Sequence, residues 1–446
     1  MKVSFTSSSL VKPSKPTWNG VMQLADWDQI GYISHISTVH IYKPPNKKEN
    51  SIAFINTLKE SLSRLLVHFY PIAGRLRWVH GGRLELDCNA MGVQFIVAET
   101  KAKLSDLGDF STSSEMLSLP PSIDYESTSL EEHPLLYIQI TKFQCGSISI
   151  CPAMSHVIVD GRCASYFLAE WAKCARGESL DFLPLLDKRV LRAGEVLTKP
   201  PPPDFVPFVN PPLLIGQNST KQEREKETTV AMLKLTKTQV DLLKYTANET
   251  RPDKSGRPYS RYETISGHIW RCSSMARGHK AEQKTGLGIS VDIRKRMQPP
   301  IPQNFFGNST IDVVSDAYSG DLILKPLGYA ASKIRETIDK TDAKFVHFTI
   351  DFWKNQEDFG PFQDVHGCDG PFYGNPNLGV TSWLTLPFLG LDFGWGREVY
   401  MGPVTHDIDG DFILCPDNSE DGSVIVRACL QVPHMKAFKK LFYDFS

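Results

Sequence analysis

The chain has 446 residues, which at roughly 150 residues per domain predicts two or three domains. Apolar residues make up 41% of the chain and charged residues 22%, as in ordinary globular proteins, and this composition argues against disorder. The 49 Lys and Arg against 50 Asp and Glu leave a formal charge of -1, without the basic excess expected of a nucleic-acid-binding protein.

The cysteines and the N-terminus indicate the cellular compartment. The nine cysteines are an odd number with no CxxC pair, so we expect neither a disulfide framework nor a structural zinc site. The N-terminus lacks the apolar run of a secretory signal, and no stretch approaches the ~18 apolar residues of a membrane span. We therefore expect a cytoplasmic protein that binds no metal, no membrane and no nucleic acid.

The first half of the chain shows both helical and strand-like patterns. Apolar residues from Ile55 to Phe69 recur at helical spacing, and Tyr70-Pro71 should end that helix. Apolar and polar residues alternate in 83–87 and in 146–150, which predicts two strands.

A histidine follows the second of these strands. Residues 155–161 read Ser-His-Val-Ile-Val-Asp-Gly, directly after a strand that we expect to end near Cys151. A helix should come next, because one face of the following segment carries Ala164, Phe167, Leu168 and Trp171. At such a junction His156 can point into a cleft, although a lone histidine is also common as a structural residue. Asp160 could orient the histidine or could only hold the turn.

A proline-rich stretch divides the chain near its middle. Seven prolines between 200 and 212 precede a charged run at 221–227, and neither a helix nor a central strand tolerates so many prolines. We expect a crossover linker at 191–220 between an N-terminal domain, 1–190, and a C-terminal domain, 221–446. An elaborate loop within one domain is the alternative.

The second half again mixes strands and helices. Residues 229–235 read as a strand and 238–247 as a helix, so both halves predict an α/β or α+β fold. Further on, Thr381 and Trp383 lie two apart and share one face of a strand. The hydroxyl of Thr381 and the indole N–H of Trp383 could therefore donate hydrogen bonds at the same site. Alternatively, the segment is a packed aromatic strand before the glycine-rich turn at 391–396.

Taken together, these segments resemble the plant BAHD acyl-CoA-dependent acyltransferases over almost the whole chain. The HxxxDG motif of that family matches 156–161, and its DFGWG motif matches 392–396. Further matches lie at 70–76, 291–294 and 306–308. The resemblance implies a two-domain α/β fold of the chloramphenicol acetyltransferase type, with a mixed sheet and flanking helices in each domain. A strand from about 375–400 should complete the N-terminal domain.

The resemblance also implies the reaction, which is direct acyl transfer from a coenzyme A thioester to an alcohol or amine. The thioester is a co-substrate, no cofactor or metal is required, and a monomer is expected. By resemblance His156 is the general base, and Asp160 pairs with Arg294 to fix the histidine loop. Thr381 and Trp383 match positions that stabilise the oxyanion.

Other positions carry weaker implications. Asp392 belongs to a motif often credited with catalysis and is counted here with the catalytic residues, although holding the strand crossing and the domain contact is its expected role.

Ser260 and Arg261 resemble the family segment beside the nucleotide and are expected to bind the CoA phosphates, or else to cap the helix that begins there. Cys151 and Cys163 lie near His156 and could act as nucleophiles, but the family implies no covalent intermediate.

Within the family, the chain looks closest to spermidine hydroxycinnamoyl transferases, which form phenolamides. Segments 26–29, 307–312, 370–375 and 429–435 carry that resemblance. Members that use shikimate or quinate place an Arg shortly before the PNLG segment, whereas this chain has Asp369 there and no Arg. A carboxylate favours a cationic acceptor.

We therefore expect transfer of a hydroxycinnamoyl group to spermidine. Asp369 and Asp312 could bind its ammonium groups, or both could be ordinary surface carboxylates. The alternatives are O-acylation of an alcohol such as shikimate or quinate, and a non-catalytic binding protein that keeps the fold.

Overall fold

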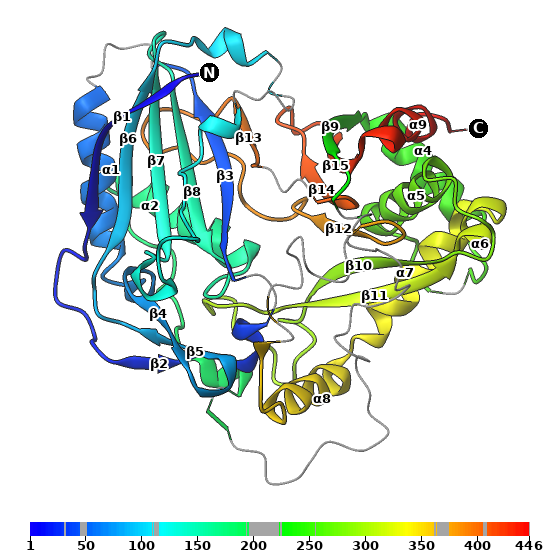
Figure 1. Ribbon diagram of the computed structural model, residues 1–446, viewed down its shortest axis with the longest axis horizontal. Coiled ribbons are helices and arrows are strands. Elements are labelled where there is room, and N and C mark those ends of the chain that lie inside the picture. Colours follow the sequence, from blue (N-terminus) through cyan, green and yellow to red (C-terminus); the bar gives the residue numbers. More distant parts are fainter. Residues whose placement is uncertain are drawn as a thin grey trace.

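The computed structural model describes residues 1–30, 33–44, 51–108, 110, 116–192, 194, 195, 223, 225–254, 256–360, 363, 374–404 and 408–445. Within these ranges two six-stranded sheets form two lobes that lie side by side (Figure 1). No helix in the described ranges has the length and apolar character needed to cross a bilayer. The two-domain α/β fold predicted from the family resemblance is confirmed.

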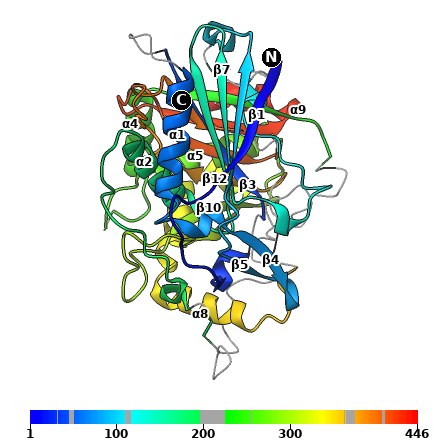
Figure 2. The same ribbon diagram turned by 90° about the vertical axis from the view of Figure 1, so that its left-hand side faces the viewer.

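The first lobe is built on a mixed sheet that two helices cover. Its strands run in the order β1 (Val3–Val11), β6 (Val93–Thr100), β7 (Leu136–Phe143), β8 (Ile148–Ser155), β3 (His35–Tyr42) and β13 (Tyr400–Pro403). Strands β6 and β7 are parallel, and the other neighbours are antiparallel. Helices α1 (Ser51–Leu65) and α2 (Gly161–Ala175) pack on one face, as Figure 2 shows from the outer side of this lobe.

The second lobe repeats this plan with more helices. Its sheet has the order β11 (Thr310–Tyr318), β10 (Lys284–Asp292), β12 (Leu378–Ser382), β14 (Asp411–Pro416), β15 (Val424–Gln431) and β9 (Thr228–Leu235). Strand β12 is parallel to both of its neighbours. The helices are α4 (Lys237–Glu249), α5 (Arg261–Ala276), α6 (Ser319–Leu324), α7 (Leu327–Lys340), α8 (Ala343–Lys354) and α9 (Val432–Phe442).

Smaller elements connect these layers. A three-stranded sheet joins β2 (Val21–Gln23), β5 (Arg83–Asp87) and β4 (Arg75–Val79). The described 3-10 turns are η1 (Asp26–Gln29), η2 (Tyr70–Ala73), η3 (His80–Gly82), η4 (Leu104–Leu107), η5 (Met116–Ser118), η6 (Leu130–Glu132) and η7 (Lys188–Leu191).

The chain crosses between the lobes late in the sequence. After β12 in the second sheet it returns to the first lobe, where β13 pairs antiparallel with β3, for example Met401 with His40. The first sheet is therefore completed by a strand from the C-terminal half. This strand begins at the last residue of the expected range, 375–400, and runs beyond it to Pro403, while the earlier part of that range forms β12 of the second sheet.

Several predicted elements are confirmed, and two have different ends. Strands β5 and β9 and helices α2 and α4 lie where the patterns place them. Helix α1 ends at Leu65, earlier than the predicted end at Tyr70. Leu66 and Phe69 lie in the turn that follows and are buried. Apolar spacing predicted a longer helix because it reports which residues are buried and does not mark the last helical residue. Strand β8 runs on to Ser155, because all eight of its residues are buried and alternation gives no sign of its end. Nearly all of the predicted linker at 191–220 lies outside the described residues.

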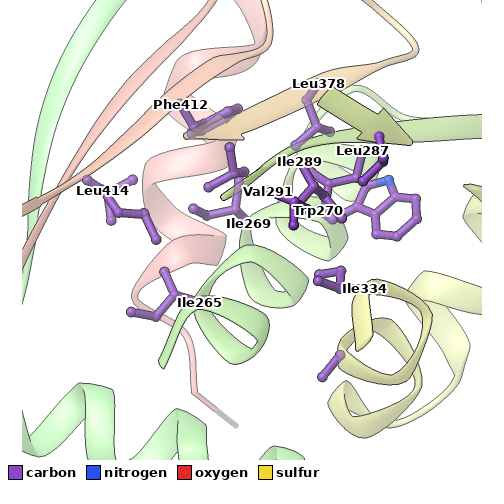
Figure 3. Packing of buried hydrophobic residues seen from close by; sticks show 14 of the residues in the cluster. Ile265, Ile269, Trp270, Leu287, Ile289, Val291, Ile334, Leu378, Phe412 and Leu414 are labelled. Atoms are coloured by element: carbon purple, nitrogen blue, oxygen red, sulfur yellow. The ribbon is translucent and has the colours of Figure 1, made fainter. Parts of the chain in front are cut away.

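The core of the second lobe lies between α5 and its sheet. Ile269 and Trp270 of α5 lie toward Ile289 and Leu287 of β10 (Figure 3), and each of these side chains is at most 2% exposed. The indole N–H of Trp270 donates to the hydroxyl of Thr285 at 3.2 Å, so burial of this side chain leaves its one polar group bonded.

Replacing Trp270 should therefore weaken the fold strongly. We expect Trp270→Ala to lower the free energy of unfolding by about 3–5 kcal/mol, because a large cavity replaces a buried indole. Urea unfolding followed by circular dichroism measures this. Tyr245→Ala, at a side chain that is 65% exposed, is the control and should leave the midpoint unchanged. A loss below about 1 kcal/mol for Trp270→Ala would contradict the packing.

Candidate active site

A cavity of about 600 Å³ lies between the two lobes. The first lobe lines it with residues of β3 and β8, among them Thr38 and Met154, and the second lobe with residues of β10, β11 and β14, among them Ile289, Ile311 and Ile413. A largely apolar cavity with a few polar groups is the usual form of a small-molecule site. The lining side chains below belong to this cavity.

His156 enters the cavity from the end of β8. The strand ends at Ser155, α2 begins at Gly161, and the half-buried histidine lies at the junction between them. Its main-chain N–H donates to the carbonyl of Ser34 at 2.9 Å, which ties the start of the loop to the segment before β3. The predicted position of this histidine, in a cleft at a strand-to-helix junction, is confirmed.

Asp160 holds the other end of the histidine loop. Its carboxylate accepts from the N–H of Cys163 at 2.9 Å as the N-cap of α2, and from the N–H of Ser309 at 3.0 Å. Arg294 pairs with it at 2.8 Å, and the side chains are 5% and 1% exposed. Burial alone would lower the pKa of Arg294, but the nearby carboxylate of Asp160 outweighs it and raises this pKa above its ordinary value. The expected pair is present, and it joins the loop to the second lobe.

Sequence reasoning assigned no role to Asn308, although it is part of a quoted family motif. The side-chain amide of Asn308 donates to the main-chain oxygens of His156 at 2.8 Å and of Val157 at 2.9 Å. The residue is 5% exposed and lines the cavity. The matches at 306–308 and 307–312 were the signals that could have pointed to it.

Thr381 and Trp383 reach the same cavity as His156. Thr381 lies near the end of β12, and Trp383 follows the strand, with its main-chain N–H donating to the carbonyl of Leu414 at 2.8 Å. Trp383 is 7% exposed and packs against Phe388 at 5.1 Å between ring centroids. The structure thus brings both residues to one place with the histidine, while their part in binding an oxyanion stays a prediction.

Asp392 lies apart from this group. It does not line the cavity. Its carboxylate accepts from the N–H groups of Gly394 at 2.8 Å and Gly396 at 2.9 Å, and its main-chain oxygen accepts from Arg176. The inclusion of Asp392 with the catalytic residues is therefore corrected: this carboxylate closes a tight turn, for which the two glycines adopt positive φ angles of 93° and 90°.

The aromatic residues of the same turn anchor the crossing segment to the first lobe. Phe393 lies edge-on to Trp171 at 4.8 Å and to Tyr42 at 6.2 Å, and Trp395 lies 4.2 Å from Phe54. These contacts fix the chain between β12 and β13 against the core of the first lobe.

The two residues expected to bind CoA phosphates lie at the start of α5. Ser260 is the N-cap, with its hydroxyl accepting from the N–H of Glu263 at 3.3 Å and the Glu263 carboxylate accepting from the N–H of Ser260 at 2.6 Å. Arg261 is exposed, and neither residue lines the cavity. The capping alternative is thus present, and a CoA contact stays a prediction for both residues.

The two candidate acceptor carboxylates have different outcomes. Asp312 lines the cavity, is half-buried, and accepts from the hydroxyl of Ser290 at 2.5 Å. Asp369 lies outside the described residues.

The cysteine alternative has little support. Cys151 and Cys163 are buried and neither lines the cavity. Burial raises the pKa of Cys163 to about 12 and raises that of Cys151 as well. Because the thiolate is the reactive form, neither thiol is suited to nucleophilic attack.

Comparisons with known proteins agree with this fold. The model of the Transferase family matches residues 1–445. The chain is 45% identical to hydroxycinnamoyl-CoA:piscidic acid hydroxycinnamoyltransferase of Actaea racemosa over 99% of both chains, and 37% identical to shikimate O-hydroxycinnamoyltransferase of Nicotiana tabacum over the full length of both. These relatives are named for acceptors other than spermidine, so they support the family and not the finer resemblance to spermidine transferases.

Solved structures share the fold. Vinorine synthase superposes with a TM-score of 0.75 at 24% identity, covering 98% of this chain and 96% of its own. F. graminearum TRI101 complexed with coenzyme A and T-2 mycotoxin superposes with a TM-score of 0.77 at 14% identity, covering 94% and 96%. At these identities the likeness extends to the two-lobed fold alone.

Breaking the Asp160–Arg294 pair should destabilise the protein. Arg294→Met leaves a buried carboxylate without its cation, and we expect a loss of about 3–5 kcal/mol in the free energy of unfolding, measured in urea. Lys237→Met removes the cation of an exposed pair with Asp241 and should leave the midpoint unchanged, since exposed pairs contribute little. Equal midpoints for both variants would show that the buried pair does not join the lobes.

Proposed function

The chain belongs to the Transferase family, the BAHD acyltransferases, and on that premise we propose that it transfers an acyl group from a CoA thioester with His156 as general base. The observation that carries this proposal is the half-buried imidazole of His156 in a cavity lined by both lobes. A site enclosed in this way can exclude water, which would otherwise hydrolyse the thioester.

The reaction follows from the chemistry of a thioester. The acceptor O–H or N–H loses its proton to the imidazole of His156 as its oxygen or nitrogen bonds to the thioester carbon. The tetrahedral intermediate then expels CoA as a thiolate, which takes the proton back from the imidazolium. An imidazole can both accept and return a proton near neutral pH, which suits both transfers.

Thr381 and Trp383 are proposed to stabilise the intermediate. Both line the cavity that holds His156, and a hydroxyl and an indole N–H are donors suited to a negative oxygen. Loss of one such donor typically costs on the order of 3 kcal/mol in the barrier.

A hydroxycinnamoyl group is the proposed acyl moiety. The relatives named above carry this group in their names, and the cavity offers apolar residues such as Ile36 and Met154 for a phenyl ring and its alkene.

For the acceptor we propose a hydroxyl group, so that the product is an ester. The support comes from the relatives at 45% and 37% identity, one named for piscidic acid and one for the O-acylation of shikimate. The second candidate is spermidine, with an amide as product. Asp312 in the cavity favours it, as does the absence of an Arg in 366–370, since carboxylates attract ammonium groups.

The base assignment has a direct test. His156→Ala should lower kcat/KM by about 10²–10⁴-fold, because a positioned general base is lost. The thiol released from caffeoyl-CoA, trapped with a thiol-specific dye, gives the rate. His80→Ala, an exposed histidine on η3, is the control. Turnover near that of the wild type in His156→Ala would refute the assignment.

A competition assay decides the acceptor. Shikimate and spermidine, at equal concentration in one tube with caffeoyl-CoA, should give at least about tenfold more ester than amide by mass spectrometry, since acceptors are discriminated by their kcat/KM ratio. Asp312→Asn should leave the ester yield within about threefold. Excess amide that is lost in Asp312→Asn would instead support spermidine and refute the hydroxyl proposal.

A further inference from the structure

The segment between β10 and β11 contacts the histidine loop at both ends. Asn308 binds the main-chain oxygens of His156 and Val157 at 2.8 and 2.9 Å, and the next residue, Ser309, donates its N–H to Asp160 at 3.0 Å. Two adjacent residues of the second lobe thus hold the loop that the first lobe contributes.

A buried ion pair fixes which end of the Asn308 amide faces the loop. Oδ1 of Asp28 accepts from both the main-chain N–H of Asn308, at 3.2 Å, and its side-chain Nδ2, at 3.1 Å. Lys188 pairs with Asp28 at 3.3 Å, and their side chains are 6% and 0% exposed. Three oxygen acceptors therefore surround Nδ2, so the amide must present its NH2 group and not its oxygen.

The contact lies on the residue that carries the proposed base. The carbonyl of His156 belongs to the peptide that follows its Cα, so a shift of this peptide turns the Cα–Cβ bond and moves the ring. Without the amide, two carbonyl oxygens would lie beside the buried carboxylate of Asp28 with no donor between them. Removal of a hydrogen-bond donor from buried acceptors is costly, and the peptide would move to relieve the repulsion.

We propose that Asn308 is a positioning residue for acyl transfer, which holds the main chain of His156 so that the imidazole meets the acceptor. The Asp28–Lys188 pair orients the Asn308 amide, and the three residues act as one unit. This inference rests on the proposed role of His156 as general base. It assigns a function to the 306–308 and 26–29 segments that the reaction scheme leaves without one.

The test compares Asn308→Ala in two backgrounds. In the wild-type background we expect kcat to fall by about 10- to 100-fold with KM for caffeoyl-CoA changed less than about threefold, since a misplacement near 1 Å costs up to about 10²-fold. In the His156→Ala background the same substitution should lower the residual rate by less than about twofold, because the base through which it acts is gone.

The matched control is a second asparagine on the same stretch. Asn304 donates to the carbonyl of Leu183 at 2.9 Å and does not line the cavity. Asn304→Ala therefore removes the same kind of bond and should change kcat by less than about twofold. Asn308→Ser keeps one hydrogen-bond donor and should therefore be faster than Asn308→Ala. If Asn308→Ala does not fold, Asn308→Ser takes its place in both backgrounds.

The outcomes separate the two proposals. An equal loss of rate from the Asn308 substitution in both backgrounds, or no loss in the wild-type background, overturns the positioning role and leaves His156 as base. Near-normal turnover of His156→Ala overturns the proposed function itself. A loss of kcat from the Asn308 substitution that appears only when His156 is present supports both the positioning role of Asn308 and the role of His156 as general base.

Discussion

The structure depends on one buried ion pair, between Asp160 of the first lobe and Arg294 of the second. Charges removed from water are tolerated only with partners in good geometry, so this pair admits one register between the two lobes. The same carboxylate caps α2 and accepts from Ser309. A single side chain thereby takes part in the helix start, the histidine loop and the contact between the lobes, and the cavity lies beside it.

The histidine loop is consequently a composite of both lobes. The first lobe supplies the strand and helix on either side of His156, and the second supplies Arg294, Asn308 and Ser309 around it. A reacting group held from several directions keeps its geometry without strain in any one contact. The 156–161, 291–294 and 306–308 segments, far apart in the chain, thus meet at one contact.

The sequence predicted local features well and long-range contacts poorly. The position of His156 and the start of α2 follow from alternation and helical spacing, which report on neighbours in the chain. The Asn308 contact joins residues 152 positions apart, and no periodicity encodes such a distance. Ser260 could cap or bind a ligand from sequence alone, since both roles use one hydroxyl. Asp392 was included with the catalytic residues because a motif shows that a residue matters and does not show how.

The late crossing that places β13 against β3 has a consequence for how the protein is made. The first lobe stays incomplete until residue 403 has left the ribosome, so during most of synthesis β3 carries an open edge on which other chains can pair. The N-terminal half by itself lacks the sixth strand of its sheet. A hybrid that exchanges lobes between relatives must transfer the stretch from Trp383 to Pro403 together with the N-terminal half, or the exchanged sheet will lack its last strand.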